Sequence, residues 1–225
     1  MPKNSPNTTA SLKHEHEYYA SGYPYIFGLD EAGRGPWAGP VAAGAVCLPL
    51  DRPDVSKVLP GVRDSKQLTP RARSGLVARI QETALTWGVG SASNTEIDEI
   101  GIVPAVKLAM RRALDMALAK VDFAPNCLFL DALLWPEMML IPQVSIIGGD
   151  QRSLSIAAAS VLAKVWRDEY MIEVDKELPQ YGFAIHKGYG TAKHQAALAT
   201  YGPSPLHRLT FAPVRKVAEA HKTEL

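Results

Sequence analysis

One segment, residues 27–40, constrains this chain more than any other, and it reads F-G-L-D-E-A-G-R-G-P-W-A-G-P. The adjacent carboxylates of Asp30 and Glu31 end an apolar run, and they offer the hard oxygen ligands that Mg²⁺ and Mn²⁺ prefer. Arg34 adds a planar, permanently charged group that suits a phosphate. Glycines let a backbone approach a ligand closely, and three follow the carboxylates: Gly33, Gly35 and Gly39. This composition predicts a site for a metal and a phosphate.

Strand-like runs flank this loop at 25–30 and 41–48, and a third lies at 86–93. Each is bounded by Gly, Pro or Asn, and together they predict an antiparallel meander. The loop is not a nucleotide P-loop, because no Gly-Lys-Ser/Thr follows it and the next element is strand-like. An ordinary surface turn is the plainer interpretation of a lone Asp-Glu, but the glycines and prolines between two core strands favour a shaped loop.

Composition sets limits on the fold and on the class of protein. The 225 residues, 47% of them apolar, can bury a substantial core as one domain. A net charge of +1 is not that of a generally basic nucleic-acid binder, although clustered carboxylates would hide local basic patches. Cys47 and Cys127 have no second cysteine at metal-ligand spacing and are expected in the core. Residues 1–17 lack an apolar leader and no run reaches membrane-spanning length, so we expect a cytoplasmic protein.

Helical and strand-like segments alternate in the middle of the chain, which is typical of a mixed sheet flanked by helices. Thr69 and Pro70 form an N-cap and first turn for a helix over 70–85. Residues 95–98 fit a capping box. Apolar residues then recur at helical spacing and predict a core-facing stripe of Val103, Val106, Met110, Ala113, Leu114, Ala117 and Leu118. The opposite face carries cations that we expect to be solvated: Lys107, Arg111 and Arg112.

Two further aspartates stand near the carboxyl ends of short apolar strands: Asp131 follows residues 127–130, and Asp150 follows a second such strand and two glycines. Sites in open α/β sheets form at that edge, so these aspartates and Asp30 converge if their strands are neighbours. A single aspartate there is more often a turn former or helix cap, and only the joint pattern favours a metal cluster. Because side chains alternate along a strand, Asp30 and Glu31 would face opposite ways, and we expect the strand to end or bulge there.

A helix is predicted after Asp150, with small residues at 157–160 that permit close packing on a sheet. Its apolar face consists of Leu154, Ala158, Val161, Leu162 and Val165. Asp168 falls near the same face, roughly 25 Å from Asp150 at about 1.5 Å per residue. These two aspartates are therefore alternatives for a single metal site.

The segment G-L-D-E-A-G-R-G-P-W-A-G-P-V resembles the opening signature of the type 2 ribonucleases H, the bacterial ribonuclease HII family. Later blocks resemble the same family in the same order: Asp64-Ser65-Lys66, then G-D-Q-R-S-L-S-I-A-A-A-S-V-L-A-K-V-W-R-D at 149–168, H-K-G-Y-G-T at 186–191 and H-R-L-T-F at 207–211. Ordered agreement of several blocks is far more specific than agreement of one. The resemblance covers residues 25–214.

This resemblance implies an α/β fold with a ribonuclease H-like mixed β-sheet flanked by helices and a helical C-terminal segment. The domain would span 23–214, after a polar, disordered extension at 1–22 and before a basic tail at 215–225. It implies a monomeric endoribonuclease with two metal ions, Mn²⁺ or Mg²⁺. The enzyme would cut RNA in RNA–DNA hybrids and cut 5′ of single ribonucleotides in duplex DNA, leaving 5′-phosphate and 3′-hydroxyl ends.

The resemblance also assigns roles to residues. The metal-binding and catalytic carboxylates would be Asp30, Glu31, Asp131 and Asp150, which favours Asp150 over Asp168. The backbone of Gly33, Arg34 and Gly35, together with Tyr189, would read the 2′-hydroxyl at an RNA-to-DNA junction. Phosphate contacts would come from Ser65, Lys66, His186 and Lys187.

One position departs from the family pattern, because Ala132 stands where a glycine usually follows the third carboxylate. Two other functions stay open at this stage. A different two-metal nuclease of similar fold, such as a junction resolvase, would act on branched DNA without ribonucleotides. A hybrid-binding protein without activity is the second, and the four intact carboxylates argue against it.

Overall fold

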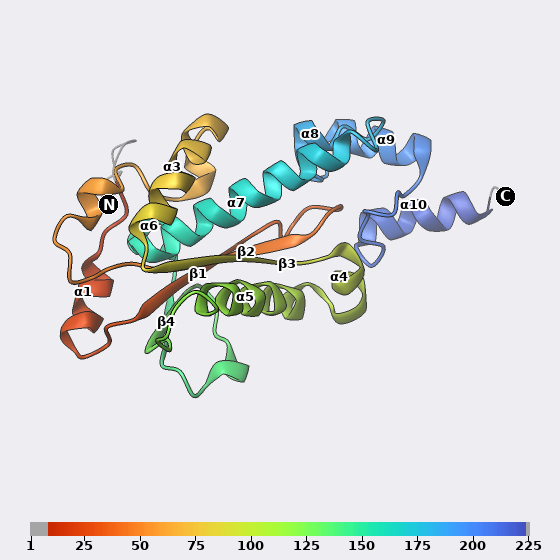
Figure 1. Ribbon diagram of the computed structural model, residues 1–225. Helices are drawn as coiled ribbons and strands as arrows, with labels where there is room; N and C mark the ends of the chain where they lie inside the picture. The colour runs from red at the N-terminus through yellow and green to blue at the C-terminus, as the bar shows by residue number, and fades with distance from the viewer. Residues whose placement is uncertain (1–8, 224–225) are drawn as a thin grey trace.

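The computed structural model describes residues 9–223, in which helices cover both faces of a five-stranded mixed sheet (Figure 1). The spatial order is β3 (Thr86–Ala92), β2 (Val41–Cys47), β1 (Ile26–Ala32), β4 (Cys127–Asp131) and β5 (Gln143–Ile146). Strands β1, β2 and β3 pair antiparallel, as the meander prediction required, whereas β4 and β5 run parallel to β1. The parallel half places the carboxyl ends of three strands at one edge.

Helix α7 (Leu154–Asp175) lies directly on one face of the sheet, as predicted. Two glycines permit this close approach, because a Cβ on Gly28 would lie 2.3 Å from the Ser155 backbone and one on Gly44 would lie 2.3 Å from the Ala159 oxygen. The small residues expected at 157–160 are all buried, and Ala159 is the one that faces Gly44. Any side chain at Gly28 or Gly44 would therefore push α7 away from the sheet.

Helices α4 (Asn94–Ile100) and α5 (Ile102–Leu118) follow β3, and α5 covers the opposite face of the sheet (Figure 1). The predicted stripe is buried at most of its positions, but Val103 is exposed. The prediction of a capping box at residues 95–98 was two residues late. Ser93 accepts the N–H of Glu96, whose carboxylate accepts the N–H of Ser93. Three consecutive residues with capping side chains made the start of the helix ambiguous.

The three cations of α5 lie at the surface or in ion pairs, in line with the expectation of solvation. Lys107 pairs with Glu137 at 2.9 Å, and Arg112 pairs with Glu96 at 2.7 Å. Arg111 stacks over the Trp135 ring.

Five further elements connect the strands and the helices described so far. They are α2 (Val55–Val58), η1 (Ser65–Gln67), α3 (Pro70–Thr83), η2 (Pro136–Met138) and α6 (Gly149–Arg152). The predicted cap of α3 is present: its N-cap hydroxyl accepts the N–H of Ala72, and a proline occupies its first turn.

The expected disordered extension is wrong for residues 9–22, where helix α1 (Lys13–Ala20) is packed on the domain, while residues 1–8 lie outside the described part. Glu15 is fully buried, and its Oε1 accepts hydrogen bonds from Ser153 Oγ at 2.6 Å and Ser155 N at 2.9 Å. The second bond satisfies a free N–H group at the start of α7, and both bonds hold the polar helix α1 on the domain.

Three helices complete the chain at the far end of α7: α8 (Phe183–His186), α9 (Ala192–Tyr201) and α10 (Ala212–Thr223) (Figure 1). Within residues 9–223, the part expected to be a basic tail belongs largely to α10. None of the described helices is long and apolar enough to cross a membrane.

Candidate active site

Strand alternation and register bring two aspartates to the same point. Asp30 shares the α7-facing side of β1 with Gly28, and Asp131 shares that side of β4 with Phe129. Parallel pairing sets Leu29 opposite Leu130, so the next residue on each strand is an aspartate. The two carboxylates therefore lie side by side at the carboxyl edge.

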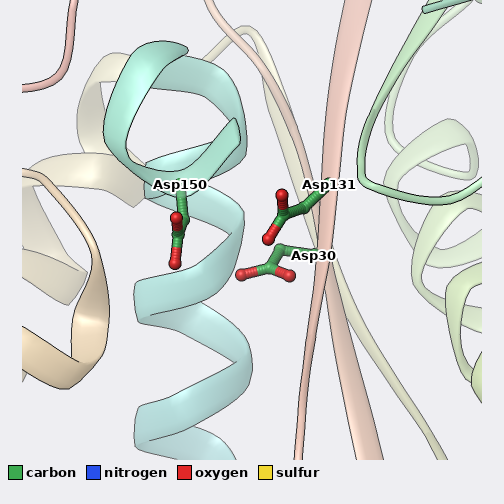
Figure 2. Close-up of side chains that lie close together, drawn as sticks. All are labelled: Asp30, Asp131 and Asp150. Carbon is green, nitrogen blue, oxygen red and sulfur yellow. The ribbon is translucent and has the colours of Figure 1, made fainter. Parts of the chain in front are cut away.

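Asp150 joins them from the first turn of α6. The N–H of Gly149 donates to Asp131 Oδ1 at 2.8 Å, which ties the start of α6 to the end of β4. One carboxylate oxygen from each of Asp30, Asp131 and Asp150 lies within 4.8 Å of the other two. Figure 2 shows the three side chains pointing toward one another. The expected convergence of the three strand-end aspartates is confirmed.

The three carboxylates lack a full set of hydrogen-bond partners and opposite charges within the described part of the chain. Asp30 is 4% exposed, and its Oδ1 accepts the N–H of Glu31 at 2.8 Å, while its buried Oδ2 has no partner among the described residues. Burial, reinforced by the charges of Glu31 and Asp131, raises the pKa of Asp30 well above its ordinary value. Burial, with the nearby Asp64 and Asp131, raises the pKa of Asp150 to about 6. Converging hard oxygens, one of them unpaired, fit a divalent cation.

Glu31 lies apart from the group of three. The expected end or bulge at Asp30-Glu31 is wrong, because β1 continues to Ala32 in unbroken register with β2. Glu31 therefore points to the other side, where its Oε1 lies 3.8 Å from Arg34 Nη1. Burial raises the pKa of Glu31, and the opposing charge of Arg34 partly offsets this effect. Its carboxylate still lines the cleft described next.

A cleft of about 240 Å³ opens over the carboxylates of Asp30, Glu31 and Asp131. It gathers most of the predicted site residues on one surface, and its lining consists of Asp30, Glu31, Ala32, Gly33, Arg34, Gly35, Ser65, Lys66, Asp131, Lys164 and Tyr189. Lys66 Nζ lies 3.6 Å from Asp150 Oδ2, so a cation stands next to the acidic group. Lys164 was not predicted, and one turn of α7 separates it from Ser160, which bonds Ser65.

Two buried arginines shape the glycine loop and were missed by the sequence analysis. Arg208 donates to the carbonyl oxygens of Gly39 at 2.9 Å, Arg34 at 3.1 Å and Gly33 at 2.7 Å. Arg167 donates to those of Pro40 at 2.8 Å, Ala38 at 3.2 Å and Lys187 at 3.0 Å. The two lie in blocks quoted above, but nothing in a single sequence distinguishes a buried arginine from a solvated one.

The loop that carries Tyr189 is locked against the glycine loop. Trp37 N–H donates to the Gly188 oxygen at 2.8 Å. A Cβ on Gly188 would lie 2.5 Å from the Ala38 oxygen, and one on Gly190 would lie 2.2 Å from the Trp37 ring. Tyr189 itself is 43% exposed at the cleft. The two loops thus form one rigid wall.

Two predicted phosphate contacts are not brought to the cleft. His186 is buried, its Nδ1 accepts the N–H of Gly188 at 3.2 Å, and its Nε2 donates to the Tyr181 oxygen at 2.8 Å. Burial lowers the pKa of His186 and so disfavours its charged form. Lys187 turns its ammonium to the oxygen of Ala184. The expectation that these side chains bind phosphate is therefore not supported by their positions.

Asp168 does not belong to the carboxylate group. Its Oδ2 pairs with Arg73 at 3.2 Å and its Oδ1 with Lys164 at 2.7 Å. Of the two alternatives raised above, Asp150 is the one that lies beside Asp30 and Asp131.

Ala132, the departure from the family pattern, adopts a positive φ of 47°. This left-handed conformation costs a residue with a Cβ about 1 kcal/mol relative to glycine. Its N–H bonds the Ile146 oxygen at 3.1 Å, which joins the end of β4 to β5.

Comparisons with known proteins agree with this geometry. The model of the family described as Ribonuclease HII matches residues 27–214. A ribonuclease HII of Chloroflexus aurantiacus is 52% identical over 206 residues, covering 90% of this chain and 93% of the relative. The crystal structure of ribonuclease H2 from Pyrococcus horikoshii has a TM-score of 0.70 at 25% identity, over 88% of this chain and 99% of that one. Bst-RNase HIII, solved in complex with Mn²⁺, has a TM-score of 0.69 at 22% identity, over 88% and 70% of the two chains.

The fold is that of the ribonuclease H-like nucleases, in which a mixed sheet carries an acidic site at its carboxyl edge. Within that class, the chain belongs to the ribonuclease HII family. It is therefore a ribonuclease H, a hydrolase of phosphodiester bonds that acts on RNA paired with DNA, and its family depends on divalent metal.

Proposed function

We propose that this enzyme, acting as a monomer, cuts the RNA strand of RNA–DNA hybrids and incises duplex DNA on the 5′ side of a single embedded ribonucleotide. The products carry 5′-phosphate and 3′-hydroxyl ends. One observation carries the proposal: Asp30 and Asp131, which converge with Asp150, line the same cleft as the glycine loop and Tyr189.

The proposal assigns metal binding to four carboxylates: Asp30, Glu31, Asp131 and Asp150. The unpaired Oδ2 of Asp30, beside two other acids, suits Mg²⁺ or Mn²⁺. Two such cations, when bound, activate a water for in-line attack at phosphorus and stabilise the leaving 3′-oxygen. Mn²⁺ in the Bst-RNase HIII structure supports this choice of ions.

Selectivity for a ribonucleotide requires contact with a 2′-hydroxyl. The Gly33–Gly35 backbone lines the cleft, and Arg208 holds the carbonyls of Gly33 and Arg34 in place. A rigid backbone accepts or donates at a fixed position, so a missing hydroxyl leaves it unpaired. Tyr189, on the wall locked to this loop, stacks on the neighbouring deoxyribose. The pair would therefore recognise an RNA-to-DNA junction.

Phosphate contacts position the duplex without reading sequence. Lys66 and Arg34 are well exposed at the cleft, with side chains 73% and 55% accessible. Ser65 lies beside them, and its hydroxyl bonds Ser160 at 2.9 Å. We assign these three residues to the phosphates that flank the cleaved bond.

The test is cleavage of a labelled DNA duplex with one ribonucleotide, with Mg²⁺, with Mn²⁺ and with chelator, by wild type, Asp30→Asn and the remote control Asp54→Asn. We expect metal-dependent incision 5′ of the ribonucleotide. It should fall about 10³-fold in Asp30→Asn, because charge stabilisation of several kcal/mol is lost, and stay unchanged in Asp54→Asn.

No incision of this duplex or of a longer hybrid would refute the proposal. Cleavage of branched all-DNA substrates would favour a resolvase. Hybrid binding without metal-dependent turnover would favour a binding protein.

A further inference from the structure

Lys164 occupies the cleft wall beside Tyr189 without a role in the scheme above. Its side chain is 16% exposed, and its Nζ lies 5.8 Å from the centre of the Tyr189 ring. Its ammonium has three N–H donors, and Asp168 Oδ1 at 2.7 Å is its one hydrogen-bond acceptor among residues 9–223. The remaining donors are available to a group in the cleft.

Asp168 forms ion pairs with both Lys164 and Arg73, and Arg73 in turn bonds the opposite wall of the cleft. Arg73 donates to the oxygens of Ser65 at 2.8 Å and Leu68 at 2.7 Å, and to Asp168 Oδ2 at 3.2 Å. A single carboxylate therefore connects Lys164 with the turn that carries Lys66. The Ser65–Ser160 bond at 2.9 Å ties the same turn to α7 one helical turn before Lys164.

We propose that Lys164 binds a phosphate of the substrate backbone next to the sugar that contacts Tyr189, and that Asp168 is a positioning residue that aims Lys164 and braces the Ser65–Lys66 turn. This inference rests on the proposed function, because it places the substrate in the same cleft. It gives Asp168 a role in substrate binding and none in metal binding.

The charges around Lys164 favour an anion at this point. Lys66 and Arg34, the other cations of the lining, each face one of the four carboxylates proposed to bind metal, Asp150 and Glu31 respectively. Lys164 instead pairs with an acid on its own helix, four residues on, so its position does not depend on the metal site. Burial lowers its pKa, and the charge of Asp168 opposes this shift and favours the charged ammonium.

The first experiment measures binding of a fluorescent RNA–DNA hybrid at several salt concentrations, in an Asp30→Asn background that prevents cleavage. We expect Lys164→Met to weaken binding about tenfold. The slope of log K against log salt should become shallower by about one, as for loss of one phosphate contact. The matched control is Lys176→Met, directly after the same helix and also paired with an acid, Glu173, which should leave the slope unchanged. An unchanged slope in Lys164→Met would overturn the phosphate contact.

The second experiment follows steady-state cleavage by Asp168→Asn across Mn²⁺ concentrations. We expect KM to rise about fivefold or more while kcat stays within about twofold and the Mn²⁺ concentration for half-maximal activity is unchanged. A loss of kcat, or a shifted Mn²⁺ requirement, would make Asp168 part of the metal machinery and overturn the assignment. Wild-type kinetics would show that Asp168 does not position Lys164.

Lys164→Met leaves the Arg73–Asp168 pair intact, so it tests the contact even if Asp168→Asn does not fold. Failure of the proposed function would look different, since wild type itself would then neither bind nor cut the hybrid.

Discussion

The glycine loop has buried carboxylates at one end and buried arginines at the other. The two groups differ in how far the protein pairs their charges with hydrogen-bond partners. At the carboxylate end, Asp30 is buried beside Asp131 and Asp150, and one of its oxygens has no partner among residues 9–223. At the other end, Arg167 and Arg208 are fully buried, and each guanidinium donates three hydrogen bonds to backbone oxygens. Neither the carboxylates nor the arginines have counter-ions of equal total charge nearby in the portion of the chain that the structure describes. Only the arginines have their charge stabilised by hydrogen bonds to backbone carbonyl dipoles.

The difference separates a structural charge from a functional one. Burial and the charge of Arg167 lower the pKa of Arg208 to about 9, so Arg208 still carries its proton at neutral pH. Its bonds fix the glycine loop without help from a ligand. The carboxylates gain nothing comparable from the protein, and their mutual repulsion is relieved by a proton or by a cation.

The largest expected effect comes from removing one of the two hydrogen-bonded arginines. Arg208→Met removes the donors to three carbonyl oxygens, and we expect the free energy of unfolding to fall by about 3 kcal/mol. Urea denaturation measures this change. Arg215→Met, at an exposed position of α10, should leave stability within about 0.5 kcal/mol of wild type. An equally stable Arg208→Met would mean that the clamp does not hold the fold.

Removing a charge from the carboxylate group should instead increase the free energy of unfolding. The pKa of Asp30 is raised on folding, so its charged form destabilises the folded state at any pH above that pKa. Asp30→Asn removes this cost, and we expect the metal-free protein to become more stable than wild type at a pH where the wild-type carboxylate is charged. Denaturation in chelator measures this, with Asp54→Asn as control, since Arg52 lowers the pKa of that aspartate. A destabilised Asp30→Asn would show that the carboxylate supports the fold.

Local rules were sufficient for the antiparallel half of the sheet and for the placement of Asp30 and Asp131 at strand ends, whereas the choice of Asp150 over Asp168 rested on the family resemblance. Alternation and strand ends located Asp30 and Asp131, and the glycines before Asp150 marked the turn into a helix. The Thr69–Pro70 pair fixed the start of α3. These signals lie within a few residues of the feature they specify, which is why a single sequence carries them.

Long-range contacts account for what the sequence analysis missed. Helix α1 is polar and is held by Glu15, which bonds serines 138 and 140 residues away. His186 looked like a loop cation, but it stacks on His194 at 4.5 Å inside a ring cluster. The burial of Arg167 and Arg208 depends on a loop more than 120 residues earlier in the chain. No local pattern encodes such pairings.

The smallest effect is a pH dependence that connects the acidic group to its cation. The pKa of Asp150 is raised to about 6, chiefly by burial and then by Asp64 and Asp131, so metal-free protein holds a proton there below pH 6. Mn²⁺ must displace that proton in order to bind. In metal-free protein, the charged form of Asp150 lowers the free energy of unfolding, and this loss disappears as pH falls through 6. We therefore expect the apparent Kd for Mn²⁺ to be nearly constant above pH 7 and to rise about tenfold per pH unit below 6, for each proton displaced. Calorimetric titration from pH 8 to 5.5 measures this, and Asp150→Asn should flatten the curve. A Kd independent of pH over that range would mean that the carboxylates are already ionised without metal, and the contrast with the arginine clamp would fail.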